Sequence, residues 1–313
     1  MEARGSLDGR GMAWLSGGGE ESEIVLSTRV RLARNLQGFP FPIRAGVEDS
    51  ARVLERARAA IEAADSLAGA DIWTVDSMEA RDRDLLLERH LVSRELLERA
   101  SEGLSHAALV LSTDDASGVM VNVEDHLRLL AFGAGFAQEE TWRRVDRLDE
   151  ELGALLPFAF HHELGYLTSC PTNVGTGLRA SVLIHLPGLV LTKEINKVLE
   201  GISQVGLTYR GFHGEGSEVV GNLFQISNQT TLGKTEEDLV DHLARVTGKV
   251  IEYERSARTV LLREAPTVLE DKVWRAFGIL RTSRSLSTGE MLNLLSGLRL
   301  GVSLKLLPMP RVE

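Results

Sequence analysis

The spacing of apolar residues along the chain predicts a mixture of helices and strands. From Val47 to Ile61, apolar positions recur every three or four residues, which is typical of one face of an amphipathic helix. The same spacing predicts helices over 83–100, a segment that contains His90, and over 142–155. Short aliphatic runs bounded by polar turn residues predict strands, and these runs are 106–112, 118–123, 181–186, 207–210 and 219–227.

Local signals predict where several elements begin and end. Pro187 is expected to stop the strand before it, and Thr192 to cap a helix that continues to 205. The segments 235–238 and 287–290 resemble capping boxes, each of which opens a further helix. Gly301 is the expected end of the last helix.

The order of these elements predicts three parts and an α+β fold. Residues 1–22 are rich in glycine and charge, and we expect a flexible lead-in. Residues 23–265 contain all the predicted strands and form the main domain, and residues 266–313 form a short helical C-terminal region. Strands and helices are segregated and do not alternate strictly, which favours α+β over a doubly wound sheet.

Composition narrows the function. The 313 residues include 35 Lys and Arg against 45 Asp and Glu, a net charge of -10, which disfavours nucleic-acid and membrane-surface binding. No apolar run approaches the roughly 20 residues of a membrane helix, and no secretory signal is visible, so a cytoplasmic location is expected. The single cysteine, Cys170, excludes an internal disulfide and argues against structural zinc, and no metal ligand is predicted.

Two familiar nucleotide-binding patterns fail. Gly233-Lys234-Thr235 resembles the end of a phosphate-binding loop, but Asn228 stands where the first glycine is needed. The segment 175–180 fits a loose dinucleotide fingerprint, yet no acidic residue follows about 20 positions later on a second strand.

Arginines are the first candidates for chemistry, and they occur in segments that are poor in neutralising acids. Arg29 and Arg31 share one face if their segment, which also holds Arg34, is extended. Arg128 follows the polar segment 124–126, Arg179 precedes a predicted strand, and Arg210 ends one. Such arginines either pair with carboxylates at the surface or cradle a polyphosphate, because guanidinium groups bind phosphate oxygens in a bidentate manner.

Two acids and the cysteine are further candidates. Glu124 and Glu215 lie in polar loops at apparent strand ends, where two carboxylates would suit a cationic substrate or would simply pair with the arginines. Cys170 lies among polar loop residues, where its thiolate could be stabilised by a bound cation; the alternative is a small packed side chain.

At these residues the sequence resembles the phosphagen kinases, which phosphorylate guanidino groups. The segment CPTNVGTGLRASV (170–182) resembles the family signature, and STRVRLARN (27–35), VNVEDHLR (121–128) and RGFHGEGSE (210–218) resemble its other active-site segments, in the same order. The resemblance covers nearly the whole chain. It implies a curved antiparallel sheet flanked by helices and followed by a helical C-terminal region.

The resemblance also implies residue roles. Segments that hold ATP match Ser27, Thr28, Arg29, Val30, Arg31, His90, Arg128, Arg179, Ala180, Ser181, Val182, Leu183, Arg210, Gly211, Phe212, His213, Gly214 and Glu215. The arginines among them would hold the phosphates, with Mg²⁺ as a further cofactor. Glu124 and Glu215 match the two catalytic carboxylates, and Cys170 matches the reactive cysteine that touches the guanidinium.

Within the family, segments such as LTKEINK and VVGNLFQISNQTTLGKTEEDLV resemble the bacterial protein-arginine kinases. Only 26 residues precede Ser27, where kinases of free arginine or creatine carry a helical domain, so an arginine on a protein surface is expected to reach the site. The resemblance implies transfer of the ATP γ-phosphate to such arginines, marking proteins for stress-linked degradation. It also implies, as partners, a zinc-binding activator, a heat-shock repressor, a Clp-type protease and a second copy of the chain.

Two departures keep other functions open. Val123 stands where the family has the first of two successive glutamates, and the phosphoarginine-binding motif Arg-Asp-x-x-Arg-Ala does not occur. The alternatives are a kinase of a small free guanidine, and a non-catalytic regulator that binds nucleotide or phosphoarginine.

Overall fold

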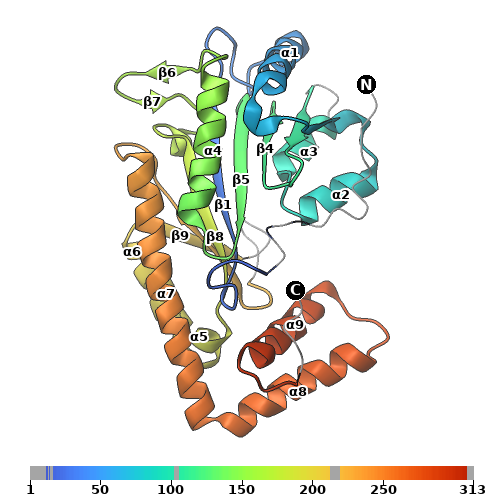
Figure 1. Ribbon diagram of the computed structural model, residues 1–313, viewed down its shortest axis with the longest axis vertical. Helices are drawn as coiled ribbons and strands as arrows, with labels where there is room; N and C mark the ends of the chain where they lie inside the picture. Colours follow the sequence, from blue (N-terminus) through green and yellow to red (C-terminus); the bar gives the residue numbers. More distant parts are fainter. Residues whose placement is uncertain (1–11, 13, 15–16, 102–105, 212–218, 309–313) are drawn as a thin grey trace.

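The computed structural model describes residues 12, 14, 17–101, 106–211 and 219–308. An eight-stranded sheet, in which every neighbouring pair is antiparallel, runs through the main domain (Figure 1). Its strands, in spatial order, are β2 (Asp71–Thr74), β3 (Ala108–Leu111), β4 (Ser117–Val121), β5 (Leu127–Ala134), β1 (Val25–Arg34), β8 (Leu178–His185), β10 (Leu223–Asn228) and β9 (Leu207–Gly211). A separate hairpin joins β6 (Phe160–His161) to β7 (Gly165–Tyr166).

Helices of the described residues pack on both faces of this sheet and extend beyond it. They are α1 (Val47–Ala63), α2 (Ala80–Glu88), α3 (Arg94–Ser101), α4 (Gln138–Gly153), α5 (Pro187–Leu191), α6 (Ile195–Gln204), α7 (Glu236–Glu264), α8 (Pro266–Thr282) and α9 (Thr288–Ser303). The long helix α7 leads from the sheet to the hairpin of α8 and α9 (Figure 1). This arrangement confirms the predicted α+β class.

The two faces of the sheet have different cores because successive side chains of a strand point to opposite sides. On one face, β1, β5 and β8 contribute wholly buried aliphatic side chains that pack with α1, α4 and α7, as Val30 and Val182 do. On the other face, a second core lies beneath α2 and α3 and contains Trp73, Leu130 and Phe132. The part of this second face that α2 and α3 leave uncovered is where charged side chains gather.

Two predicted helices differ from the structure. The segment 83–100 is not one helix: α2 ends before His90, whose φ of 56° reverses the chain, and α3 begins at Arg94. Thr192 does not begin a helix but ends α5, where its hydroxyl donates to the carbonyl of Gly188 at 2.9 Å. Apolar spacing continues across both interruptions, so it gives no sign of them.

One single-residue prediction is also wrong. Gly301 does not end α9 but lies inside it. A Cβ atom at this position would come within 2.2 Å of Val273 on α8, so only glycine fits there. Within the predicted lead-in, Trp14 is buried, and its ring stacks on Phe132 with 4.8 Å between ring centroids. Glycine at 301 therefore serves close helix packing, and the lead-in contributes to the second core.

Arg34 connects the sheet to α4 and α7 and has no part in the charged face. Its side chain is fully buried, with Nη2 lying 2.7 Å from Asp149 and 3.3 Å from Glu236. Its Nη1 donates to the carbonyl of Thr176 at 2.7 Å, and its guanidinium lies 3.5 Å from the ring centroid of Tyr166. A buried cation with this many partners holds three elements in one arrangement.

Replacing Arg34 with alanine is expected to lower the free energy of unfolding by about 3–5 kcal/mol, because two carboxylates lose their buried counter-charge. The matched control is Arg52→Ala, which removes an exposed arginine 3.9 Å from Asp49 and should cost less than about 1 kcal/mol. Urea unfolding of both variants measures the difference. Equal effects would contradict the role given to Arg34.

Candidate active site

Strand register places the five predicted arginines on one face of the sheet. In antiparallel pairing, residues directly opposite each other share a face, and Arg31 pairs directly with Arg179. Arg29 lies two residues before Arg31 on β1. The remaining two come from β5, where Arg128 pairs with Ala33, and from β9, where Arg210 pairs with Gln225. We call this side of the sheet the arginine face.

The predicted ATP-binding segments divide between the two faces. Ser27, Ser181 and Leu183 alternate with the arginines on the arginine face. The side chains of Thr28, Val30, Ala180 and Val182 lie on the opposite, helix-covered face, as does Gly211 by its register, and they cannot touch a ligand above the arginines. Within these segments, therefore, only alternate side chains point toward the arginine face.

A hollow above the arginine face has a volume of about 260 Å³. Its lining residues include Arg29, Arg31, His90, Arg94, Glu95, Arg210 and Gln225. A smaller hollow beside it is lined by Ser27, His90, Ser181 and Leu183. The left-handed turn at His90 is what brings this side chain from the α2–α3 connection to the sheet.

Positive charge accumulates in this hollow. Burial, and after it the charge of Arg128, lowers the pKa of Arg29 to about 10. Burial lowers the pKa of Arg31 well below its ordinary value, and the charges of Arg29, Arg128 and Arg179 lower it further. The guanidinium groups thus destabilise one another, and a bound anion would relieve this repulsion.

Carboxylates meet the arginines at one end of the face. Arg128 Nη2 lies 3.0 Å from Glu124 Oε2, and Arg128 Nη1 lies 3.9 Å from Glu95 Oε2. Burial opposes ionisation of Glu95, but hydrogen bonds from its own backbone and from Ser93, with the charges of Arg128 and Arg31, lower its pKa overall. Glu124 is more exposed than Arg128, so a ligand can reach it.

Asp125 ties the Glu124 loop to the Cys170 loop. One oxygen of its fully buried carboxylate accepts hydrogen bonds from Asn35 Nδ2 and from the backbone N–H of Ser169, both at 2.6 Å. Asp125 follows Glu124 and Ser169 precedes Cys170, so these hydrogen bonds hold the loop that carries Glu124 beside the loop that carries Cys170. Cys170 itself is partly buried, with its Sγ 3.1 Å from the hydroxyl of Thr172.

The glycines after Cys170 have a packing role. Gly175 and Gly177 have φ values of 114° and 67°, and a Cβ on either would come within 2.6 Å of a backbone oxygen, of Thr231 and Ala33 respectively. The loop therefore needs glycine in order to lie against its neighbours.

Other predicted residues lie outside this geometry. Phe212, His213, Gly214 and Glu215 fall outside the described residues. Val123, where the family pattern has a glutamate, is fully buried in the second core.

Among residues 17–101, 106–211 and 219–308, no group of three or more His, Cys, Asp or Glu side chains could hold a metal ion. No helix among the described residues is long and apolar enough to cross a membrane.

Four polar residues that line the hollow were missed by the sequence interpretation: Ser93, Arg94, Glu95 and Gln225. Arg94 and Glu95 begin α3, which the sequence predicted as the middle of a longer helix. Gln225 carries no charge, and the only feature of the sequence that could have identified it is its position in the predicted strand 219–227.

Comparison with known proteins agrees with this geometry. Residues 52–257 match the sequence model described as ATP:guanido phosphotransferase, C-terminal catalytic domain. The chain belongs to this family. Residues 266–313 of this ATP:guanido phosphotransferase match a second model, the protein-arginine kinase McsB C-terminal domain.

Similar curated proteins place this ATP:guanido phosphotransferase in the protein-arginine kinase branch, as the sequence resemblance predicted. It is 44% identical to the protein-arginine kinase of Pelotomaculum thermopropionicum, over 98% of this chain and 86% of that protein. It is 45% identical to that of Halalkalibacterium halodurans, over 94% of this chain and 82% of that protein.

Solved structures share the fold. A lombricine kinase superposes with a TM-score of 0.66 at 23% identity, covering 80% of this chain and 71% of that one. The substrate-free duplicated taurocyamine kinase of Schistosoma mansoni superposes with a TM-score of 0.67 at 25% identity, covering 91% of this chain and 44% of that one. The phosphagen kinase fold expected from the sequence is thereby confirmed.

The repulsion on the arginine face leads to a prediction for Arg31→Met, which keeps an unbranched apolar side chain and removes the guanidinium charge. The variant should gain about 0.5–2 kcal/mol of unfolding free energy and lose affinity for tripolyphosphate. Thermal unfolding with and without tripolyphosphate measures both effects. The exposed Arg143→Met serves as the control, and a less stable Arg31→Met protein with unchanged anion binding would contradict the prediction.

Proposed function

We propose that the arginine face binds the triphosphate of ATP and that the enzyme transfers its γ-phosphoryl group to arginine side chains of proteins. The observation that carries this proposal is the strand register, which places Arg31 opposite Arg179 and the other three arginines on the same face of the sheet, beside a hollow of about 260 Å³. Family membership supplies the nucleotide, since ATP:guanido phosphotransferases use ATP. Phosphates would be held by Arg29, Arg31, Arg128, Arg179 and Arg210.

Glu124 is the carboxylate that would receive the substrate. It already holds one guanidinium, that of Arg128 at 3.0 Å, so its environment suits a second one. A guanidinium is protonated and therefore a poor nucleophile. Glu124 would orient the substrate nitrogen in line with the γ-phosphorus, and either Glu124 or Glu215 would accept the proton as the N–P bond forms and the bond to the ADP oxygen breaks.

Cys170 would contact the substrate guanidinium from the other side. Support comes from Asp125, whose hydrogen bonds to Asn35 and Ser169 hold the Cys170 loop beside the Glu124 loop. A pre-arranged carboxylate and sulfur reduce the cost of orienting a flexible side chain.

Mg²⁺ fits this site as part of the bound nucleotide. Glu95 lines the hollow, and both Glu95 and Glu124 lie near Arg128. Mg²⁺ is commonly held by one or two carboxylates together with substrate phosphates and waters. When bound, it would neutralise charge on the phosphates.

The wider role follows from the relatives. We propose protein arginines as the acceptor because the curated relatives are protein-arginine kinases. By the same resemblance, the modified proteins would be marked for stress-linked degradation in the cytoplasm. A zinc-binding activator, a heat-shock repressor, a Clp-type protease and a second copy of the chain would be partners.

The Glu124→Gln variant should lower kcat by about 10²–10⁴ with an arginine-bearing protein as the acceptor, because glutamine neither accepts a proton nor carries the charge that orients the substrate guanidinium. The matched control is Glu95→Gln, which also neutralises a carboxylate near Arg128 and should lower kcat far less. Initial rates of ATP turnover measure both. Near-normal turnover by Glu124→Gln would refute its role as the base.

Acceptor choice distinguishes the alternatives. Incubation of the wild-type enzyme with ATP, Mg²⁺ and casein should give phosphoarginine peptides in mass spectrometry, whereas free arginine should remain unmodified. Phosphorylation of free arginine alone would indicate a small-guanidine kinase. Binding of ATP without phosphorylation of either acceptor would indicate a non-catalytic regulator.

A further inference from the structure

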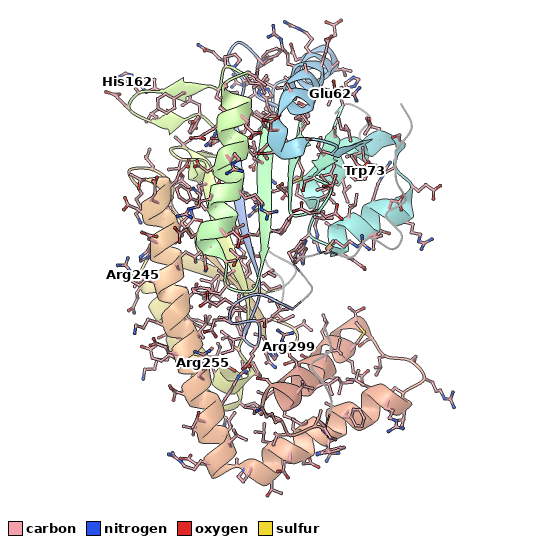
Figure 2. All side chains as sticks on the ribbon, viewed as in Figure 1. Glu62, Trp73, His162, Arg245, Arg255 and Arg299 are labelled. Carbon is pink, nitrogen blue, oxygen red and sulfur yellow. The ribbon has the colours of Figure 1, made fainter. Side chains whose placement is uncertain are left out.

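The C-terminal helix α9 covers part of the arginine face. Alternation along β8 places His185 on the same side as Leu183, which lines the smaller hollow. His185 is 1% exposed, and its Nε2 lies 2.8 Å from the hydroxyl of Ser296 on α9. Figure 1 shows α9 beside the lower end of the sheet, and Figure 2 places Arg299 of the same helix at this junction. A residue of α9 thus contacts β8 next to the nucleotide site.

The same helix also holds the turn that enters β10. Asn222 Nδ2 donates to the Ser296 hydroxyl oxygen at 2.7 Å, and the backbone N–H of Gly221 donates to Asn293 Oδ1 at 2.9 Å. Gly221 and Asn222 have φ values of 66° and 54°. Glycine and asparagine are the residues that favour this left-handed backbone, and the two hydrogen bonds from this turn to α9 fix where it lies.

From this turn, a short path leads to the hollow. The carbonyl of Asn222 accepts a hydrogen bond from the backbone N–H of Leu186 at 2.9 Å, which joins the turn to the end of β8. Three residues further on, Gln225 pairs with Leu183 on one side and with Arg210 on the other. Gln225 and Arg210 both line the larger hollow. The position of the turn therefore affects where Gln225 and Arg210 lie in the hollow.

The contacts to the sheet are separate from those that hold the α8–α9 hairpin together. The hairpin packs through small and apolar residues, where Gly301 and Gly297 lie against Val273 and Ala276. Ser296 is buried, and its hydroxyl forms hydrogen bonds with two residues of the main domain, His185 and Asn222. Removing it would take a hydrogen-bond partner from the buried His185 and from the half-buried Asn222.

We propose that Ser296 and Asn293 are positioning residues of the ATP site: by holding His185 and the turn 221–222, they fix how β8 and β10 present Leu183, Gln225 and Arg210 to the nucleotide. This inference rests on the proposed function, because it takes the arginine face as the ATP site. It makes α9, which lies outside the catalytic-domain match of 52–257, part of the nucleotide site. Linkage requires that bound nucleotide in turn stabilise the α9 contacts.

The first test measures the dissociation constant of a non-hydrolysable ATP analogue with Mg²⁺ by calorimetry. The Ser296→Ala and Asn293→Ala variants should raise this constant about 2- to 30-fold, the range of coupling through a packed network. Ser296→Thr, which keeps the hydroxyl, should restore it to within about 2-fold of the wild-type value. The matched control is Val273→Ala, which loosens the α8–α9 hairpin and should lower the melting temperature without changing the constant.

The second test uses reciprocity. The same analogue should slow hydrogen exchange in 219–228 and 288–303 of the wild-type protein, and Ser296→Ala should abolish that effect. Because Asn293 is exposed, its alanine variant carries the test if Ser296→Ala does not fold.

Three results would overturn the inference. The first is unchanged analogue binding in both alanine variants, and the second is an equal loss of affinity in Val273→Ala. The third is that the analogue does not change the rate of hydrogen exchange in 288–303 of the wild-type protein. A wild-type protein that does not bind the analogue at all is a different failure, because it refutes the ATP site itself and with it the proposed function.

Discussion

Antiparallel pairing of β1 with β5 and β8 places like charges next to one another, and the rest of the site depends on this placement. Arg31 stands directly opposite Arg179, an arrangement that costs free energy in an isolated sheet. The opposite side of the same strands offsets that cost, because Val30, Leu32 and Val182 are wholly buried against the helices. A stable hydrophobic layer thus holds a surface whose charges repel until an anion arrives.

Around this surface, separate elements hold the groups that would act on the anion. Asp125 fixes the loop of Glu124 against that of Cys170 through hydrogen bonds that reach β1. Helices α2 and α3 bring His90 and Glu95 over one side of the sheet. Helix α9 covers the far end of β8. The site is therefore assembled from several parts of the chain, and the sheet is the common support.

Sequence patterns predicted five strands of the main sheet, β3, β4, β8, β9 and β10, and the shared face of Arg29 and Arg31, because the two-residue period of a strand is a local property. They did not predict the partners of Arg34, because these partners lie 115 and 202 residues away and only the fold brings them together. The chain reversal at His90 is set by its left-handed backbone, which apolar spacing does not report. Gln225 entered the site through strand register, and register depends on pairing with distant strands. Spacing alone did not decide whether the arginines bind phosphate or pair with carboxylates, and the motif resemblance favoured phosphate binding.

The central claim is that a triphosphate lies on the arginine face, and a crystal structure of the enzyme with Mg²⁺ and a non-hydrolysable ATP analogue tests it most directly. The account predicts phosphate oxygens within hydrogen-bond distance of Arg29, Arg31, Arg128, Arg179 and Arg210. Phosphates bound instead in the large apolar groove between α6 and α7, or on the helix-covered side of the sheet, would contradict it.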